Sequence, residues 1–261
     1  MKRRFALALD LATPGDALTR ALAGCGQVDR VLACEPLATL RDPALALRVA
    51  GDEEQLPFAN ESFDLVVSAL SLQWVNDLPG TLAQIRRALK PDGLLLAVLP
   101  GGETLTELRQ SLALAEAEIE GGVSPRVAPF VEVRTMGSLL QRAGFALPVT
   151  DVDRLTVRYS GLGALLRDLR TMGATNILAE RRRKPLRRAT FVRTESIYAD
   201  RFADADGRLR ATFDLLWMSA WAPHESQQQP LKPGSARMRL ADALGTEEHT
   251  AGEKTDTRPR R

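Results

Sequence analysis

The stretch FDLVVSALSLQWVNDLPGTLAQIRRALKPDGLLLAVLP, residues 63–100, decides the fold class. It begins with a nearly continuous apolar run, Phe63–Leu70, which is typical of a strand buried on both faces. Apolar residues at helical spacing follow over Leu78–Leu89, and KPDG, residues 90–93, predicts a turn. A second apolar run, Leu94–Pro100, predicts the next strand. This order indicates two parallel strands joined by a crossover helix.

The residues before this unit show the same alternation of apolar runs and helical patterns. Strands are predicted over Phe5–Leu11, Val28–Cys34 and Leu45–Asp52, and a helix with Asp16 as its N-cap over 16–23. Downstream, helices are predicted over 104–120, 136–144, 161–173 and 185–202, and strands over 149–159 and within 204–221. Apolar strands that alternate with helices predict an α/β doubly wound, mostly parallel sheet.

Composition limits the class of protein. The chain has 261 residues, 44% hydrophobic and 26% charged, which suits one large globular domain or two small ones. No apolar run reaches the length of a membrane span, and MKRRF at the start lacks the features of a signal peptide. Cys25 and Cys34 have no metal-ligand spacing, so we expect buried thiols in a reducing, cytoplasmic compartment.

Charge is distributed unevenly along the chain. Residues 1–150 carry 14 Lys and Arg against 18 Asp and Glu, whereas residues 151–261 carry 21 against 15. The densest basic segment is RRRKPLRR, Arg181–Arg188, called the basic run below. It predicts a docking surface for an acidic partner or an anionic membrane. Nucleic acid is not expected as a partner, because no aromatic residues interleave with these cations.

Candidate ligand-binding residues follow successive strands. Asp10 ends the first strand, Glu35 follows the second, Asp52 and Glu53 follow the third, and Ser68–Leu72 follow the fourth. In doubly wound sheets, ligands bind beyond the carboxyl ends of the strands. A carboxylate after the second strand can accept hydrogen bonds from both hydroxyls of a ribose. A single acidic residue after a strand is usually a solvated loop residue. The prediction of a ligand site therefore depends on several acidic residues that follow successive strands.

Several of these motifs resemble a known family. LPF with FDLV in residues 56–66, together with LKPDG, residues 89–93, resembles the class I S-adenosylmethionine-dependent methyltransferases of the type 11 group. The segments SALSLQWVNDLP, GGETLTELRQSLALAE, EGGVSPRVAPF and WAPHESQQQP further resemble the complex I assembly factor 5-like branch and its alphaproteobacterial relatives. The resemblance covers about residues 5–240 and begins almost at Met1, whereas relatives usually carry helices before the first strand, so a more open pocket is expected.

This resemblance implies a Rossmann-like sheet of seven strands with a helical insertion before the last strand, and S-adenosylmethionine as cofactor. The residues that it implies for cofactor binding are Asp10, Gly15, Glu35, Asp52, Glu53 and Leu70. The predicted organisation is a methyltransferase-like core over 1–160 and 207–223, an insertion over 161–206, a C-terminal extension over 224–244 and a disordered tail over 245–261.

The first loop departs from the family pattern. The family usually has several glycines after Asp-Leu, but this chain has DLATPGD, residues 10–16. Ala12 brings a Cβ towards the ligand, Pro14 lacks an N–H group, and Asp16 adds a negative charge. Gly15 is out of register with the family glycines. The loop is therefore either a tolerated variant or a weakened cofactor site.

No catalytic residue is evident from the sequence. A metal site is not expected, since the two histidines are His224 and His249, and His249 lies in the polar tail. His224 with Glu225 could form an acid–base pair, although a structural turn is the simpler interpretation.

The predicted function is an S-adenosylmethionine-dependent methyltransferase-family protein in respiratory complex I assembly, which modifies or binds a complex I subunit in the cytoplasm or at the inner membrane surface. Two alternatives stay open. The family resemblance also implies a protein-arginine hydroxylase, and the unusual first loop suits a non-catalytic assembly chaperone.

Overall fold

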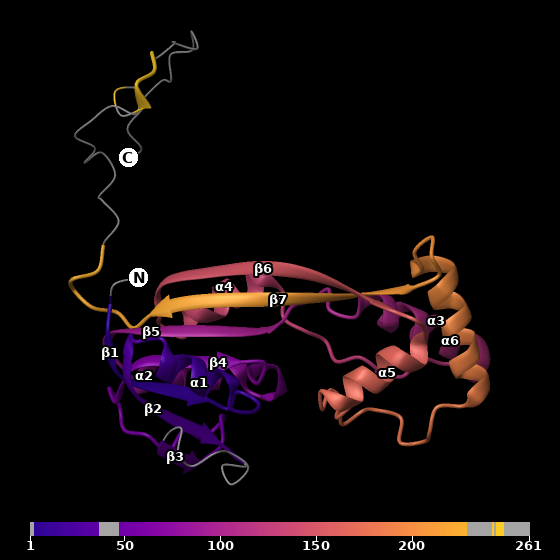
Figure 1. Cartoon of the computed structure of the whole chain (residues 1–261), viewed down its shortest axis with the longest axis horizontal. Coiled ribbons are helices and arrows are strands. Elements are labelled where there is room, and N and C mark those ends of the chain that lie inside the picture. The colour runs from indigo at the N-terminus through magenta and orange to yellow at the C-terminus, as the bar shows by residue number, and fades with distance from the viewer. Residues whose placement is uncertain (1–2, 37–46, 229–241, 243, 248–261) are drawn as a thin grey trace, which may run out of the picture. The chain divides into compact units, whose positions relative to one another are not determined.

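Seven strands form one sheet in the order β3-β2-β1-β4-β5-β7-β6 (Figure 1). The computed structural model describes residues 3–36, 47–228, 242 and 244–247. Strands β1 to β5 pair in parallel, and β7 runs antiparallel to both β5 and β6. The strands are β1 (Phe5–Leu11), β2 (Val28–Glu35), β3 (Leu47–Ala50), β4 (Phe63–Ala69), β5 (Leu89–Pro100), β6 (Ala146–Tyr159) and β7 (Leu209–Trp221). The predicted doubly wound α/β sheet of seven strands is confirmed.

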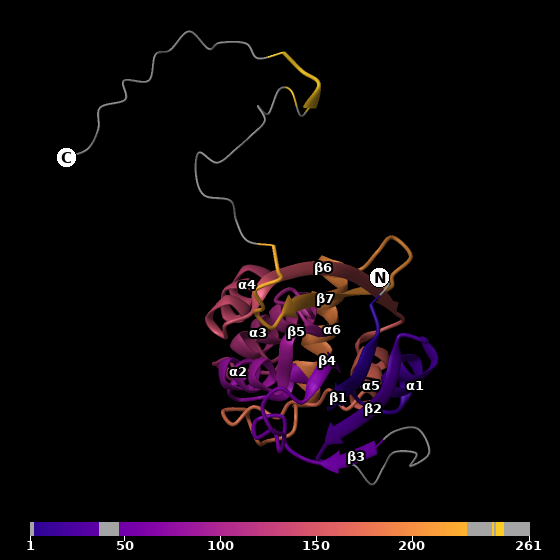
Figure 2. The same cartoon turned by 90° about the vertical axis from the view of Figure 1, so that its left-hand side faces the viewer.

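Helices cover both faces of this sheet (Figure 2). The helices are α1 (Ala17–Gly24), η2 (Leu72–Trp74), α2 (Leu78–Ala88), α3 (Thr106–Glu120), α4 (Val133–Arg142), α5 (Leu162–Thr171) and α6 (Arg188–Phe202). Leu9 of β1 joins a core cluster with Ile85 of α2 and Leu140 of α4. Its neighbour Ala8 joins a different cluster, which α1 covers with Leu22. Successive side chains of a strand point to opposite faces, so β1 contributes to both cores.

A second body of helices is built around the far ends of β6 and β7 (Figure 1). Helices α5 and α6 lie between these two strands in the chain, which gives the predicted helical insertion before the last strand. Its core contains Leu108 of α3, Leu165 of α5, Tyr198 of α6 and Leu209 of β7. Helix α3 therefore shares a core with the insertion, although it precedes α4 and β6 in the sequence.

Three local predictions need correction. KPDG lies inside β5 as an irregularity in the pairing with β4, with Asp92 at a φ of 60°, instead of forming a separate turn. Asp16 occupies the N-cap position of α1 as predicted, but its side chain makes no capping hydrogen bond to that helix. Cys34 is buried as predicted, but Cys25 is exposed, because it follows the last residue of α1. Element ends otherwise differ from the predictions by a few residues, as frayed ends do.

Two compact units divide the chain, Met1–His224 and Glu225–Arg261, and every strand above lies in the first. Most of the predicted C-terminal extension and tail, including His249, lies outside the described residues. Within the described residues, no helix has the length and apolar character needed to cross a membrane.

Candidate cofactor and acceptor site

The predicted site residues lie at the carboxyl edge of the parallel strands. Asp10 is near the end of β1, Glu35 ends β2, and Leu70 directly follows β4. Asp52 and Glu53 follow β3 in a short loop. Because β3, β2, β1 and β4 are neighbours and parallel, their carboxyl ends meet at one edge.

An acidic cluster forms where β2 and β3 end. Burial raises the pKa of the Cys34 thiol to about 11, and the nearby charges of Glu53, Glu35 and Asp52 add to that shift. Burial likewise raises the pKa of Glu53, with Asp52, Glu54 and Glu35 contributing in the same direction. Glu35 pairs with Ala50 in the sheet, so the end of β2 lies beside the loop that carries Asp52 and Glu53, and the negative charges of two segments lie near the Cys34 thiol. Such a concentration of negative charge suits a ligand with hydroxyl and amino hydrogen-bond donors.

Asp10 has a structural partner within the fold. Its side chain is fully buried, and Thr19 of α1 donates a hydrogen bond to Asp10 Oδ2 at 2.5 Å. This bond ties the end of β1 to the helix that follows the first loop. Asp10 can therefore set the shape of the loop. A direct contact between Asp10 and the cofactor stays a prediction.

The first loop contains a left-handed residue that is not glycine. Ala12 has a φ of 54°, and its N–H donates to the Cys34 carbonyl at 2.8 Å. Gly15 has a φ of 71°, and a Cβ placed there would meet no atom within 4 Å. The backbone thus adopts the turn that glycine favours, but at Ala12 an L-residue carries the steric cost, about 1–2 kcal/mol.

Hydrogen bonds join the first loop to the end of β4. The Ala69 N–H donates to Thr13 Oγ1 at 3.0 Å, and the Ser71 hydroxyl donates to the Leu11 carbonyl at 3.3 Å. Leu70 between them is left-handed, with a φ of 56°, and its side chain is exposed. These hydrogen bonds hold the loop after β1 against the loop after β4. A ligand that spans the ends of β1 and β4 needs both loops in fixed positions.

Glu54, which the sequence did not single out, positions the acidic loop against α2. Its side chain accepts hydrogen bonds from the backbone N–H groups of Asn76 and Asp77. Gln84 of α2 donates to the Glu54 carbonyl at 2.7 Å. The hydrogen bonds from Asp77 and Asn76 lower the pKa of the Glu54 carboxyl. The position of Glu54 next to Asp52 and Glu53 in the segment GDEE could have indicated its role from the sequence.

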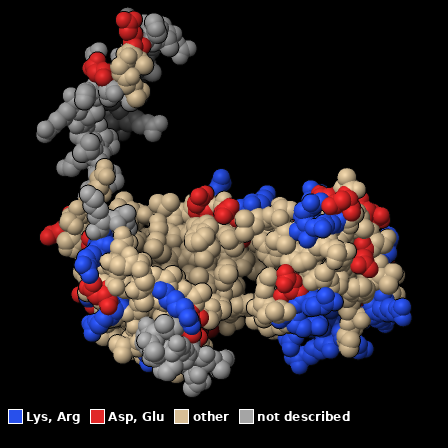
Figure 3. Space-filling view, viewed as in Figure 1, with Lys and Arg blue, Asp and Glu red and all other residues tan. Residues whose placement is uncertain are grey.

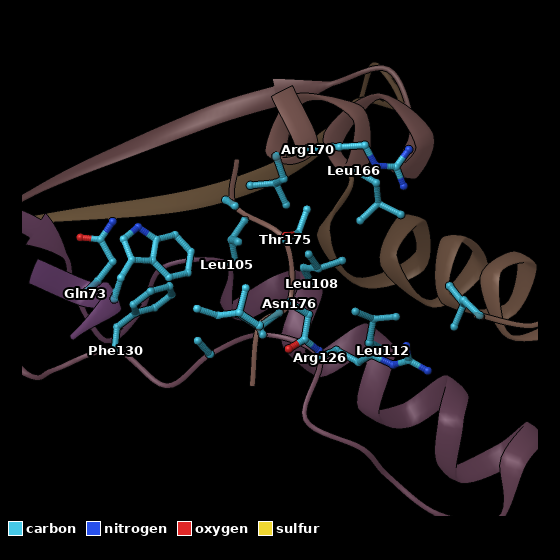
Figure 4. A pocket seen from close by; sticks show the side chains of 17 residues that line it. Gln73, Leu105, Leu108, Leu112, Arg126, Phe130, Leu166, Arg170, Thr175 and Asn176 are labelled. Carbon is cyan, nitrogen blue, oxygen red and sulfur yellow. The ribbon is translucent and has the colours of Figure 1, made fainter. Parts of the chain in front are cut away.

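A largely apolar pocket of about 330 Å³ opens next to the end of β4 (Figure 4). Gln73 and Phe130 lie at one end, and Arg126 and Leu112 lie at another (Figure 4). Trp74 of η2 also lines the pocket. Its remaining walls come from α3 and its N-cap residue, the segment between α3 and α4, α5, and the segment that joins α5 to α6, namely Leu105, Leu108, Val127, Ala128, Leu166, Leu169, Arg170, Ala174, Thr175, Asn176, Ile177 and Leu186. The pocket therefore lies between the methyltransferase-like sheet and the insertion, which the sequence could not reveal.

Lys and Arg side chains gather over the insertion (Figure 3). Within the basic run, Arg182 and Arg187 lie 2.8 and 3.3 Å from the carboxylate of Glu120, whose side chain is only 3% exposed. Arg183 and Lys184 are exposed, and no acidic partner is present for them among the described residues. The run thus contains both structural cations and cations available to a partner.

Across residues 3–36, 47–228 and the few described beyond, no three His, Cys, Asp or Glu side chains converge as a metal-binding set would.

The sheet order and the loop-lined edge define a protein of the class I methyltransferase fold. Residues 9–97 match the protein family described as a methyltransferase domain. A crystal structure of a proposed methyltransferase from Bacillus halodurans superimposes with a TM-score of 0.55 at 18% identity, covering 86% of this chain and 95% of that one. That likeness supports the fold.

Curated relatives are more similar in sequence. The arginine-hydroxylase NDUFAF5, mitochondrial, of Danio rerio is 47% identical over 194 residues, which cover 74% of this chain and 60% of the relative. A malonyl-[acyl-carrier protein] O-methyltransferase of Laribacter hongkongensis is 42% identical over 194 residues, 74% of this chain and 62% of the relative. The chain therefore spans about 60% of the length of these relatives.

Proposed function

We propose that this protein binds S-adenosylmethionine at the carboxyl edge of β1, β2 and β4 and acts on a respiratory complex I subunit during assembly. The observation that carries the cofactor assignment is the acidic cluster of Glu35, Asp52 and Glu53 at the ends of β2 and β3. When bound, this cofactor supplies an electrophilic methyl group.

The two halves of the cofactor meet different surroundings. Glu35 can accept hydrogen bonds from both ribose hydroxyls, and Asp52 and Glu53 are placed on the adenine side. The first loop suits the methionine half less well, because Ala12 carries a methyl group and Pro14 has no N–H to donate. The residues present therefore fit the adenosine half well and the amino-acid half weakly.

Action on a complex I subunit rests on similarity to the NDUFAF5 arginine hydroxylases. In this proposal the subunit approaches the pocket beside Leu70 and Trp74, where the cofactor edge and the insertion meet. The cations of the basic run can contact an acidic partner or the inner membrane surface, so the protein works in the cytoplasm close to that membrane.

Two alternatives have their own supporting observations. Protein-arginine hydroxylation is supported by the name and 47% identity of the relative from Danio rerio. An assembly chaperone without catalysis is supported by the first loop, where Ala12 and Pro14 replace residues that would favour close approach of the cofactor.

Intact-mass analysis of complex I subunits from cells that lack this protein separates the three functions. Loss of one methylene mass from a subunit supports methylation, and loss of one oxygen mass supports hydroxylation. Unchanged subunit masses with reduced complex I would favour the chaperone. Unchanged masses and normal complex I would contradict a role in assembly.

A further inference from the structure

Helix α1 covers its face of the sheet only over part of the strands. Its Leu22 packs in one cluster with Ala8 of β1 and Leu65 of β4. That cluster includes β5 and β7 only through Leu94 and Trp221. Figure 3, in the orientation of Figure 1, shows a broad uncharged surface over the middle of β5 and β7. Strands in the interior of such a sheet normally have both faces buried, so this surface is unusual.

Four large apolar side chains are exposed on this part of the sheet. They are Leu96 of β5, Trp217 of β7, and Val149 and Leu155 of β6, each between 39% and 61% exposed. Leu96 and Val149 both pair with Ser219, two residues from Trp217, and Leu155 lies six residues along β6 from Val149. Opposite residues of paired strands and every second residue along a strand share a face. These four side chains therefore form one surface, called the uncovered face below.

The dimensions of the uncovered face match those of one α-helix. It extends across three neighbouring strands, which is about 10 Å, close to the diameter of a helix with its side chains. From Val149 to Leu155 it extends about 20 Å, the length of about 13 helical residues. Its four side chains expose on the order of 400 Å², about half of what each subunit of a stable dimer buries. The area therefore favours a single helix over a second copy of this chain.

The border of the uncovered face along β6 is acidic. Asp151 pairs with Trp217 in the sheet, and Asp153 lies two residues further along β6, so both carboxylates share this face. Both are exposed, and neither has a cation partner among the described residues. The adjacent Arg154 is paired instead with Asp214, 2.7 Å away. Charge complementarity therefore favours a partner with Lys or Arg beside its apolar residues.

We propose that the uncovered face binds an amphipathic helix of a partner protein, with an apolar stripe flanked by Lys or Arg. Apolar side chains spaced by three and four residues along that helix pack around Trp217. Basic side chains on one flank of the helix reach Asp151 and Asp153. The uncovered face is separate from the acidic cluster and from the pocket beside Trp74, so the inference does not depend on the proposed function.

The test compares three blocked peptides by calorimetry on the full chain. The lysine peptide, acetyl-KLAKLAKKLAKLAK-amide, has leucines at helical spacing with lysines beside them. The glutamate peptide replaces every lysine by glutamate, and the scrambled peptide has the residues of the lysine peptide without an apolar stripe. The lysine peptide is expected to bind about tenfold more tightly than either of the others. Equal binding of the lysine and scrambled peptides would mean attraction by charge alone and would overturn the inference.

A double substitution removes the two apolar anchors at the centre of the face. Leu96→Ser with Trp217→Ser should weaken binding of the lysine peptide about thirtyfold, the scale of lost interface anchors. The matched control, Ile119→Ser with Val192→Ser, removes two exposed apolar side chains from α3 and α6 and should leave the affinity unchanged. Unchanged melting temperatures would show that both variants are folded. Full affinity without the two anchors would contradict the inference.

A charge exchange tests the acidic border without changing the anchors. Asp151→Lys with Asp153→Lys should reverse the preference, so that the glutamate peptide binds more tightly than the lysine peptide, most clearly at low salt. An unchanged preference would show that the lysine peptide binds elsewhere, and the inference would fail.

Sedimentation of the full chain without peptide tests the other occupant. A monomer is expected. A dimer that Leu96→Ser with Trp217→Ser dissociates would show that a second copy of this chain covers the face, which would overturn the inference.

Discussion

Arg182 Nη1 lies 2.8 Å from Glu120 Oε2, and this ion pair fixes the segment before α6 to the end of α3. Thr190 of α6 donates to Glu120 Oε1 at 2.6 Å, so one buried carboxylate joins the basic run and two helices. A basic run that looks uniform in sequence therefore has members with different roles.

The first prediction separates these roles by stability. Arg182→Ser should lower the free energy of unfolding, because it removes the closest cation from a carboxylate that is nearly inaccessible to solvent. Arg183→Ser should change the free energy of unfolding by less than about 0.5 kcal/mol, as is usual for an exposed position. Urea denaturation measures both. Equal destabilisation by the two substitutions would show that the Glu120 contact is unimportant.

The second prediction concerns acid stability. The Thr190 hydrogen bond, together with Arg182 and Arg187, lowers the pKa of Glu120 below its ordinary value. The stability that this carboxylate provides is thus present above its unfolded-state pKa and is lost as the pH falls through the lower folded-state value. Glu120→Gln should be less stable than the parent protein at pH 7, and the difference should shrink at acidic pH. A difference that is independent of pH would contradict this assignment.

The third prediction concerns alkaline stability and thiol reactivity. Burial raises the pKa of Cys34 from 9.0 to about 11, so the folded state holds its proton longer than the unfolded state does. Stability from this thiol is complete below pH 9 and declines as the pH rises towards 11. Cys34→Ala should reduce the loss of stability over that range. At pH 8 a disulfide reagent should modify exposed Cys25 rapidly and Cys34 slowly, and equally fast reaction of both thiols would disprove this interpretation.

The fourth prediction tests the left-handed residue of the first loop. Ala12→Gly removes the Cβ at a φ of 54° and should stabilise the protein by about 1 kcal/mol, even after the entropy cost of glycine. The control Ala23→Gly, at an exposed position within α1, should destabilise it by about 1 kcal/mol. Thermal denaturation compares the two. Destabilisation by both would mean that Ala12 is not strained.

The fourth prediction extends to cofactor binding. We expect Ala12→Gly combined with Pro14→Gly to bind S-adenosylmethionine more tightly than the parent protein, while adenosine affinity changes little. The reason is that only the methionine half meets this loop. Calorimetry with both ligands measures the difference, and equal gains for adenosine would place the effect elsewhere.

The fifth prediction tests the ribose ligand. Glu35→Ala should reduce affinity for S-adenosylhomocysteine by about 1–3 kcal/mol, the scale of lost charge-assisted hydrogen bonds. Glu61→Ala, which removes an exposed carboxylate from the loop before β4, is the control and should have no effect. Identical titration curves for Glu35→Ala and the parent protein would show that the nucleoside binds elsewhere.

Much of this molecule follows from local pattern. Apolar runs such as Phe63–Ala69 are long enough for strands, and their alternation with helices permits few arrangements other than a doubly wound sheet. The placement of Glu35, Asp52 and Glu53 at strand ends follows as well, since parallel strands bring their carboxyl ends to one edge. The departure at Ala12 is likewise visible in the residue types alone.

Long-range contacts account for the rest. The sharing of a core between α3 and the insertion, the pairing of Arg182 with Glu120 and the uncovered face that carries Leu96 and Trp217 all depend on residues distant in sequence. Periodicity reports which face of an element is apolar, but it does not specify which other element that face meets. The pocket beside Trp74 forms only when η2, α3 and α5 pack together. Because this packing depends on contacts between distant segments, the sequence pattern could not predict which side chains line the pocket.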